Sequence, residues 1–153
     1  MYLTLRLESP DQPDVIALLQ RATDYLLARY PVESCNILDV NGLRADGVRF
    51  WVAREAHYAV GCCALIPLAS RTGEIKRLYV DDAARGQGVG NQLLETLEAA
   101  AQRDGMTTLM LEAGVNQPQA LGLYSKRGYS RRGPYGNYRD DPLSVFMQKL
   151  LPE

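Results

Sequence analysis

The chain has 153 residues, a length that suits one domain with one hydrophobic core, and we expect residues 1–153 to form a single domain. Hydrophobic residues make up 46% and charged residues 23%, which excludes a disordered or fibrous protein. A net charge of -1 gives no support for a nucleic-acid-binding or anionic-membrane surface. Neither is therefore an expected partner.

Three further features limit the class of protein. No apolar run is long enough to span a bilayer, and the first eight residues alternate like a strand rather than a signal peptide. The three cysteines, two of them adjacent, form neither a disulfide framework nor a zinc site. We therefore expect a cytoplasmic, reducing location and no metal.

The apolar pattern predicts the elements in chain order. It first predicts a strand at 3–8 and a helix that begins near Pro13 and stops before Pro31. The mixed, turn-rich stretch 31–47 reads as a loop with one short helix around Ile37 to Val40. The elements predicted after this loop are strands at 49–54, 58–65 and 74–80, a helix at 89–104, a strand at 107–112, a helix from Pro118 toward Gly128, and a strand at 144–150. Hairpins in the first half favour antiparallel pairing, and the helix at 89–104 favours a parallel crossover, so a mixed sheet with helices on both faces follows.

The most informative stretch is rich in glycine and lies between a predicted strand and a predicted helix. Residues 81–91 read Asp-Asp-Ala-Ala-Arg-Gly-Gln-Gly-Val-Gly-Asn. Glycine lets the backbone approach a ligand closely, and the unpaired N–H groups at a helix start bind phosphate or pyrophosphate. Asn91 excludes the ending of a Walker A loop, and the G-x-G-x-G spacing departs from a dinucleotide-binding fingerprint. A glycine-rich connector without a ligand stays open at this point.

Two blocks of residues resemble the GNAT acetyltransferases. Arg85-x-x-Gly88-x-Gly90 resembles their pyrophosphate loop, and residues 74–80 resemble the strand before it. Residues 116–129 resemble their second conserved block. The tail at 134–147 resembles a branch of small bacterial GNAT proteins that includes the YsnE-like ones. The resemblance covers residues 58–150 well and the first half loosely.

This resemblance implies a fold and an activity. The fold is α/β (α+β), with a mixed, mostly antiparallel twisted sheet of six to seven strands and a splayed central parallel pair. The strands of that pair are 74–80 and 107–112, and the pantetheine arm of the cofactor would lie in the gap. The activity is acetyl-CoA-dependent N-acetyl transfer, in which a primary amine attacks the thioester directly. The alternative is a non-catalytic acyl-CoA-binding module of the same fold.

The matching positions supply the expected cofactor-binding residues. These are Leu78, Tyr79, Val80, Arg85, Gly86, Gln87, Gly88, Val89, Gly90, Asn116 and Tyr124. Two of them have a plainer alternative. Arg85 is also compatible with an exposed turn, and Asn116 is also a good cap for the helix that Pro118 begins.

The resemblance also supplies two catalytic residues. Tyr124 matches the position of the family's general acid. A tyrosine suits this role because a phenol with an ordinary pKa of about 10 stays protonated near neutral pH. Glu74 matches an acidic position that many members use as general base. The plainer alternatives are a core aromatic for Tyr124 and a solvated glutamate for Glu74.

The acceptor site is expected from the first loop and the last loop of the chain. Glu33 and Ser34 lie in the first, and Tyr135 and Tyr138 in the last. Carboxylates there would hold a cationic amine of a small molecule or peptide, and tyrosines would cover an apolar body. The same segments are equally compatible with solvated loops. A homodimer is compatible with the family.

A cysteine nucleophile is the remaining alternative for acyl transfer. Cys62 and Cys63 with His57 would supply a thiol and a base. Adjacent strand residues face opposite ways, however, and small thiols inside an apolar strand are typical of a core. We therefore expect both cysteines to be structural.

Overall fold

The computed structural model describes residues 2–153, which form one seven-stranded sheet with helices on both faces. The strands are β1 (Leu3–Leu7), β2 (Arg49–Glu55), β3 (Tyr58–Leu68), β4 (Thr72–Val80), β5 (Thr108–Gly114), β6 (Ser130–Arg132) and β7 (Ser144–Leu150). The helices are α1 (Pro13–Leu27), α2 (Val40–Leu43), α3 (Val89–Arg103) and α4 (Pro118–Lys126), with single 3₁₀ turns at Val32–Ser34 and Asp82–Ala84. The strand order is β1-β2-β3-β4-β5-β7-β6. All neighbours pair antiparallel except β4 and β5.

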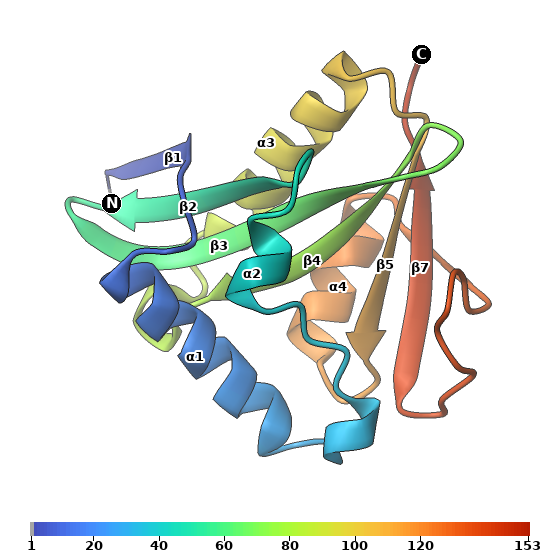
Figure 1. Cartoon of the computed structure of the whole chain (residues 1–153), viewed down its shortest axis with the longest axis horizontal. Coiled ribbons are helices and arrows are strands. Elements are labelled where there is room, and N and C mark those ends of the chain that lie inside the picture. The colour runs from blue at the N-terminus through green and yellow to red at the C-terminus, as the bar shows by residue number, and fades with distance from the viewer. Residues whose placement is uncertain (1) are drawn as a thin grey trace.

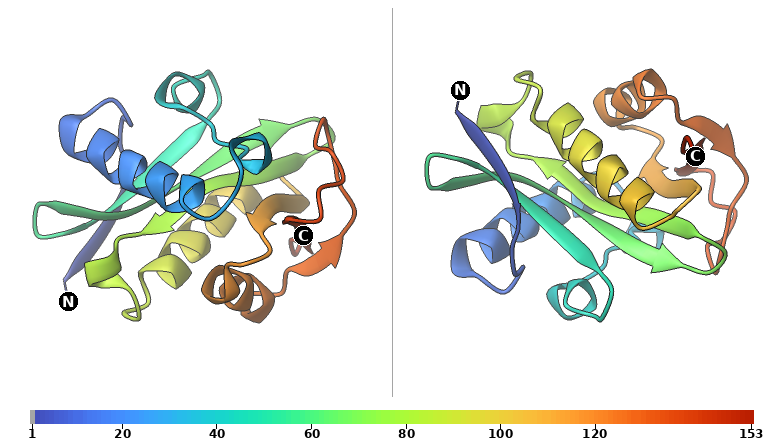
Figure 2. Two further views of the ribbon diagram at one scale, coloured as in Figure 1. Left: turned by 90° about the horizontal axis from the view of Figure 1, so that it is seen from below. Right: turned by 90° about the horizontal axis from the view of Figure 1, so that it is seen from above.

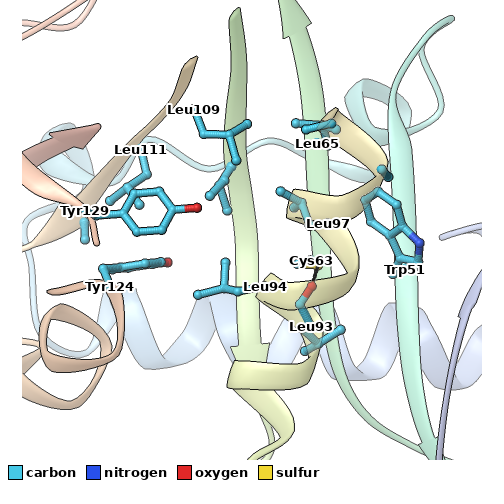
Figure 3. Packing of buried hydrophobic residues seen from close by; sticks show 14 of the residues in the cluster. Trp51, Cys63, Leu65, Leu93, Leu94, Leu97, Leu109, Leu111, Tyr124 and Tyr129 are labelled. Atoms are coloured by element: carbon cyan, nitrogen blue, oxygen red, sulfur yellow. Dashed lines mark hydrogen bonds between the residues drawn. The ribbon is translucent and has the colours of Figure 1, made fainter. Parts of the chain in front are cut away.

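Helices α1 and α2 cover one face of the sheet, and α3 and α4 cover the other (Figures 1 and 2). Each face has its own core, because successive strand residues point to opposite sides. Cys62 packs in the core under α1, whereas Cys63 packs in the larger core under α3. Figure 3 shows this larger core, in which Tyr124 and Tyr129 lie beside the leucines of α3 and β5.

The parallel pair is splayed, as the resemblance implies. β4 and β5 pair only from Thr72↔Thr108 to Ile75↔Leu111, so the rest of β4 has no neighbour on this side. A bulge reinforces the divergence. Cys62 pairs with Tyr79 but Ala64 pairs with Lys76, so β4 has one extra residue between them. Arg77 in this bulge adopts the left-handed conformation, with φ of 58°.

The structure corrects two local predictions. The short helix in the first loop covers Val40–Leu43 rather than Ile37 to Val40, because the Asp39 carboxylate accepts a hydrogen bond from Gly42 N at 2.8 Å and fixes the helix start. The sequence pattern also missed β6, which has only three residues and is held by pairing with β7. Such a short strand shows no apolar periodicity of its own.

The remaining elements begin and end close to their predicted positions. Gly105, with φ of 80°, follows α3, and Pro118 is the first residue of α4. Within residues 2–153, no helix has both the length and the apolar character needed to cross a membrane. β1 is an edge strand that pairs only with β2, so its other edge is free to pair with a second copy of the chain. The homodimer itself stays a prediction.

Candidate active site

A cavity of about 620 Å³ lies where β4 and β5 diverge. Helix α1 and the loop after it form one wall, and the start of α3 and of α4 form another. Part of the last loop, including Tyr138 and Leu143, also lines it. The volume suits an elongated small molecule, and the site forms at the open end of the splayed strands.

The glycine-rich loop shapes the phosphate-binding end of this cavity. Gly86 and Gly88 have φ of 77° and 82°, a conformation that other residues adopt only with strain. Gly88 is the N-cap of α3 and has no side chain to accept from the first helical N–H groups. Those N–H groups therefore stay available at the positive end of the helix, which favours an anion.

Arg85 lies beside this loop and is fixed by several contacts. Its Nε donates to the Val80 carbonyl at 3.1 Å, and its guanidinium pairs with the exposed Asp82 at 2.9 Å. The guanidinium also lies over the rings of Tyr25 and Tyr79, at 5.2 and 5.8 Å from the two centroids. Arg85 is thus partly ordered by the protein and adds positive charge at the cavity wall.

The open edge of β4 forms the floor of the cavity. Leu78, Tyr79 and Val80 all line it, and none of them pairs with β5. Two strand residues, Arg77 and Leu78, oppose Cys63 at the bulge, so the backbone here is turned away from regular pairing. A free strand edge is suited to pair with an extended amide chain.

Tyr124 lines the cavity from the last turn of α4. The side chain is buried, and its ring packs edge-on against Tyr129 with centroids 5.7 Å apart. Burial, together with the nearby Cys63 and Glu112, raises the pKa of the Tyr124 phenol above its usual value. The hydroxyl therefore stays protonated at physiological pH values and is a weaker acid than an exposed phenol.

Glu74, the predicted general base, does not line the cavity. It is buried, and the hydroxyls of Tyr135 and Tyr138 donate to its Oε2 at 2.7 and 2.5 Å. Tyr138 and Lys76 line the cavity beside it, whereas Glu74 itself does not. Glu74 therefore binds a tyrosine of the cavity wall, Tyr138, without lining the cavity itself.

Glu112 is the carboxylate that does line the cavity, and the sequence analysis missed it. It lies on β5 just beyond the last residue that pairs with β4. Burial raises the pKa of its carboxyl group, although a hydrogen bond from Ser144 Oγ at 2.7 Å and the charge of Lys76 oppose that effect. A single acidic residue inside an apolar strand, Leu-Met-Leu-Glu-Ala, is the signal that could have found it.

Tyr30 connects α1 with the end of β5 across the cavity. Its hydroxyl accepts a hydrogen bond from Asn116 N at 3.1 Å and lies against Gly114, in the place where a Cβ atom would be. Residue 114 must therefore be glycine for the ring to cross here. Burial also raises the pKa of the Tyr30 phenol, so this contact is neutral.

Comparisons with known proteins agree with this geometry. The acetyltransferase (GNAT) domain matches residues 46–131, more than half of the chain. The chain belongs to the GNAT family. A protein of Azospirillum brasilense named IAA acetyltransferase is 43% identical over 97% of this chain and 98% of its own length. The uncharacterized N-acetyltransferase YsnE of Bacillus subtilis is 33% identical over 90% and 92% of the two chains.

Solved GNAT structures share the fold. The structure of a putative acyl-CoA N-acyltransferase from Klebsiella pneumoniae superposes with a TM-score of 0.81, at 35% identity over 97% of each chain. The structure of a PaiA N-acetyltransferase from Thermoplasma acidophilum in complex with coenzyme A superposes with a TM-score of 0.79. The two sequences are 18% identical, and the match covers 98% of this chain and 99% of that one. The family assignment, the α/β fold and the acetyl-CoA-dependent N-acetyltransferase activity inferred from the sequence are therefore confirmed.

Most of the residues expected to bind the GNAT cofactor do line the cavity. These are Leu78, Tyr79, Val80, Arg85, Gly86, Gly88, Val89, Gly90 and Tyr124. Gln87 and Asn116 do not line it. The N-cap position of α4 is Gln117, whose side chain accepts from Gly114 N at 2.9 Å, so Asn116 does not cap that helix either.

The expected acceptor residues are divided in the same way. Ser34 and Tyr138 line the cavity, whereas Glu33 and Tyr135 do not. Tyr135 packs edge-on against Tyr138 and Phe146 and holds the last loop against the sheet. In the last loop, Tyr135 therefore packs within the fold, whereas Tyr138 and Leu143 line the cavity.

The cysteine alternative is not supported by the geometry. Cys62 and Cys63 are fully buried on opposite faces of β3, and neither lines the cavity. Burial raises the pKa of the Cys62 thiol to about 12, which leaves almost no thiolate at neutral pH. His57 lies in the exposed β2–β3 turn, with its carbonyl bound by Arg54 at 2.8 Å. Both cysteines are core residues.

Proposed function

We propose that this chain acetylates the primary amine of a small molecule by direct transfer, with Glu112 as general base and Tyr124 as general acid. One observation carries the proposal. A single cavity at the splayed strands is lined by a buried carboxylate of raised pKa and a buried phenol that stays protonated. These two groups supply a proton acceptor and a proton donor, as transfer of an acetyl group from a thioester to an amine requires.

The residues of the cavity fit the cofactor. The N–H groups of the loop from Arg85 to Gly90 would hold the pyrophosphate, and the free edge of β4 would pair with the pantetheine amides. The backbone N–H of Leu78, on that edge, would hydrogen-bond the thioester carbonyl oxygen. Acetyl-CoA supplies the electrophilic thioester and its leaving sulfur when it is bound.

The chain's own groups handle the protons. Glu112 accepts the proton that the attacking amine loses, and its raised pKa makes it a stronger base than an exposed carboxylate. Tyr124 donates its hydroxyl proton to the departing sulfur. Glu74 contributes indirectly, because it orients the Tyr138 hydroxyl in the cavity wall.

The test compares two glutamine variants. Glu112→Gln should lower kcat by about 100-fold or more, since general-base catalysis contributes factors of about 100 to 10,000. Glu74→Gln keeps a hydrogen-bonding side chain beneath Tyr138 and should lower kcat by less than about tenfold. Thiol release from acetyl-CoA with a panel of primary amines, beside calorimetric binding of acetyl-CoA, measures both. The opposite ranking of the two variants would restore Glu74 as the base.

The proposed compartment is the cytoplasm, as the composition suggested. All three cysteines are free thiols, and a reducing environment preserves this state. A non-catalytic acyl-CoA-binding module would bind acetyl-CoA in the same cavity but release no thiol with any amine, so the assay above also separates that alternative.

A further inference from the structure

The charged groups that line the cavity are unequal in number. Among residues 2–153, Arg29, Lys76, Arg77 and Arg85 line it as cations, and Glu112 is the one carboxylate. Within residues 2–153, Arg85 has an ion pair, with Asp82, but the other three cations have no carboxylate within 4.0 Å. The cavity therefore has positive charge that the protein does not pair.

Lys76 lies in the cavity wall beside Asn36 and Tyr138. Its Nζ donates to the Asn36 carbonyl at 3.1 Å and to the Tyr138 hydroxyl at 2.8 Å. An ammonium group has three hydrogens, so one donor remains. Glu74 reaches this lysine only through the Tyr138 hydroxyl, which accepts from Lys76 and donates to Glu74.

The remaining donor lies next to the proposed base. Lys76 and Glu112 are the next residues after Ile75 and Leu111, the last pair between β4 and β5, and both line the cavity. The charge of Lys76 also acts on Glu112 directly. A carboxylate that can accept a proton from an amine and a cation that can bind a second group thus lie on neighbouring strands at the point where these diverge.

Two guanidinium groups add further positive charge to the cavity wall. Arg77 donates to Thr23 Oγ1 at 3.1 Å and to the Leu19 carbonyl, and its Nε finds no partner in the described part of the chain. Arg29 stacks on Tyr25 with 3.5 Å between its central carbon and the ring centroid. None of these contacts neutralises the charge, so the field in the cavity favours an anionic group.

Apolar and aromatic side chains complete the wall between α1 and the last loop. Those that line the cavity here are Leu26, Tyr30, Ile37, Tyr138 and Leu143. We propose that the acceptor is a small amino acid with an apolar side chain. Its amine lies at Glu112, its carboxylate binds the free donor of Lys76, and its side chain packs on these walls. This inference rests on the proposed function and names the class of its acceptor.

Other amines fit this arrangement less well. A polyamine would place a second cation beside Lys76 and Arg77 with no free carboxylate to receive it. In a peptide, the group that follows the N-terminal amine is a neutral amide and not a carboxylate. Its hydrogen bond to Lys76 would be weaker, because a charged hydrogen bond is about twice as strong as a neutral one. Both classes are outcomes of the test.

The test is a thiol-release assay with acetyl-CoA and four acceptors that differ in charge. L-phenylalanine carries the carboxylate, L-phenylalaninamide and 2-phenylethylamine lack it, and spermidine adds cations. Each kcat/KM is corrected for the fraction of unprotonated amine. We expect phenylalanine to exceed the other three by about tenfold or more, the difference that one charged hydrogen bond makes.

Variants then assign the preference to Lys76. Lys76→Met should reduce the ratio of kcat/KM for phenylalanine to that for 2-phenylethylamine by about 10- to 100-fold. Lys76→Arg should retain most of the preference, and Lys126→Met, at an exposed lysine of α4, should leave the ratio unchanged. Calorimetric binding of acetyl-CoA reports that each variant is folded.

Three outcomes would contradict the inference. Equal or better turnover of the amide, the amine or spermidine by the unaltered protein would exclude a carboxylate-bearing acceptor and leave the proposed acetylation of amines intact. A ratio that Lys76→Met does not change would exclude Lys76 as the carboxylate site. Acetyl-CoA binding without thiol release for any acceptor would contradict the proposed function as well.

Discussion

The two ends of the cavity are built in different ways. The cofactor end consists of consecutive residues, 85–90, together with the free edge of β4, and most of its expected ligand contacts are backbone groups. The acceptor end consists of side chains from five separate segments. These are Tyr30 after α1, Asn36 in the first loop, Lys76 on β4, Glu112 on β5 and Tyr138 in the last loop. A local pattern in the sequence can encode the first end but not the second.

The difference extends to electrostatics. At the cofactor end, the positive field comes from the start of α3 and from Arg85, both near solvent. At the acceptor end, burial itself changes the chemistry, because it raises the pKa values of Glu112 and Tyr138. Substitutions at the two ends should therefore affect different steps of the reaction.

The largest expected effect separates chemistry from cofactor binding. Tyr124→Phe removes the hydroxyl that donates to the departing sulfur and keeps the ring that packs on Tyr129. We expect kcat to fall by about 100- to 10,000-fold, while the Kd for acetyl-CoA changes little. Thiol release and calorimetry measure the two quantities.

The matched control for this substitution is Tyr58→Phe, which removes a hydroxyl from a tyrosine that is 77% exposed, on β3. It should change neither kcat nor Kd. If Tyr124→Phe weakened acetyl-CoA binding and kcat equally, the hydroxyl would contribute to binding rather than to proton transfer.

A smaller effect is expected from the cofactor loop. Gly88→Ala forces a residue with a Cβ atom into φ of 82°, at a cost of about 1–2 kcal/mol, so acetyl-CoA should bind roughly tenfold more weakly. The Cβ atom itself meets no neighbour within 4 Å, so the cause is the backbone conformation and not a clash. Calorimetry gives the Kd, and kcat at saturating acetyl-CoA should stay nearly unchanged.

Gly122→Ala is the paired control for the loop. Gly122 lies within α4, outside the cavity lining, and a Cβ atom there also meets nothing within 4 Å. Alanine is favoured over glycine inside a helix, so this variant should be equally or more stable and bind acetyl-CoA normally. Equal affinities for the two variants would show that the left-handed conformation of residue 88 is not needed for binding.

The sequence predicted the cofactor end because its physical requirements are local. A strand, a turn with left-handed glycines and a helix start are consecutive, and the apolar face of the helix at 89–104 is regular. The same reasoning gave the strand and helix order. It could not give β6, whose three residues are defined by pairing, or the bulge at Arg77, which appears only in the register between β3 and β4.

The acceptor end shows the limit of a local pattern. Glu74 and Glu112 are both acidic residues on neighbouring parallel strands, and the resemblance singled out Glu74. Which of them faces the cavity depends on Tyr135 and Tyr138, which approach from a loop more than sixty residues away and cover Glu74. That loop's position depends in turn on ring packing against Phe146. No spacing in the sequence encodes such contacts.

The smallest expected effect is a shift in the pH dependence at the acceptor end. As a base, Glu112 must be ionised, and burial raises its pKa above the ordinary carboxyl value of 4.5. With the acceptor and acetyl-CoA saturating, kcat should therefore be constant above this raised pKa and fall as the pH drops through it. Glu112→Gln has no group that titrates there, so its residual kcat should lack this limb, whereas Glu74→Gln should keep it. If the limb stayed in Glu112→Gln and disappeared in Glu74→Gln, the base would be the carboxylate beneath the two tyrosines, and the acceptor end would have to open for turnover.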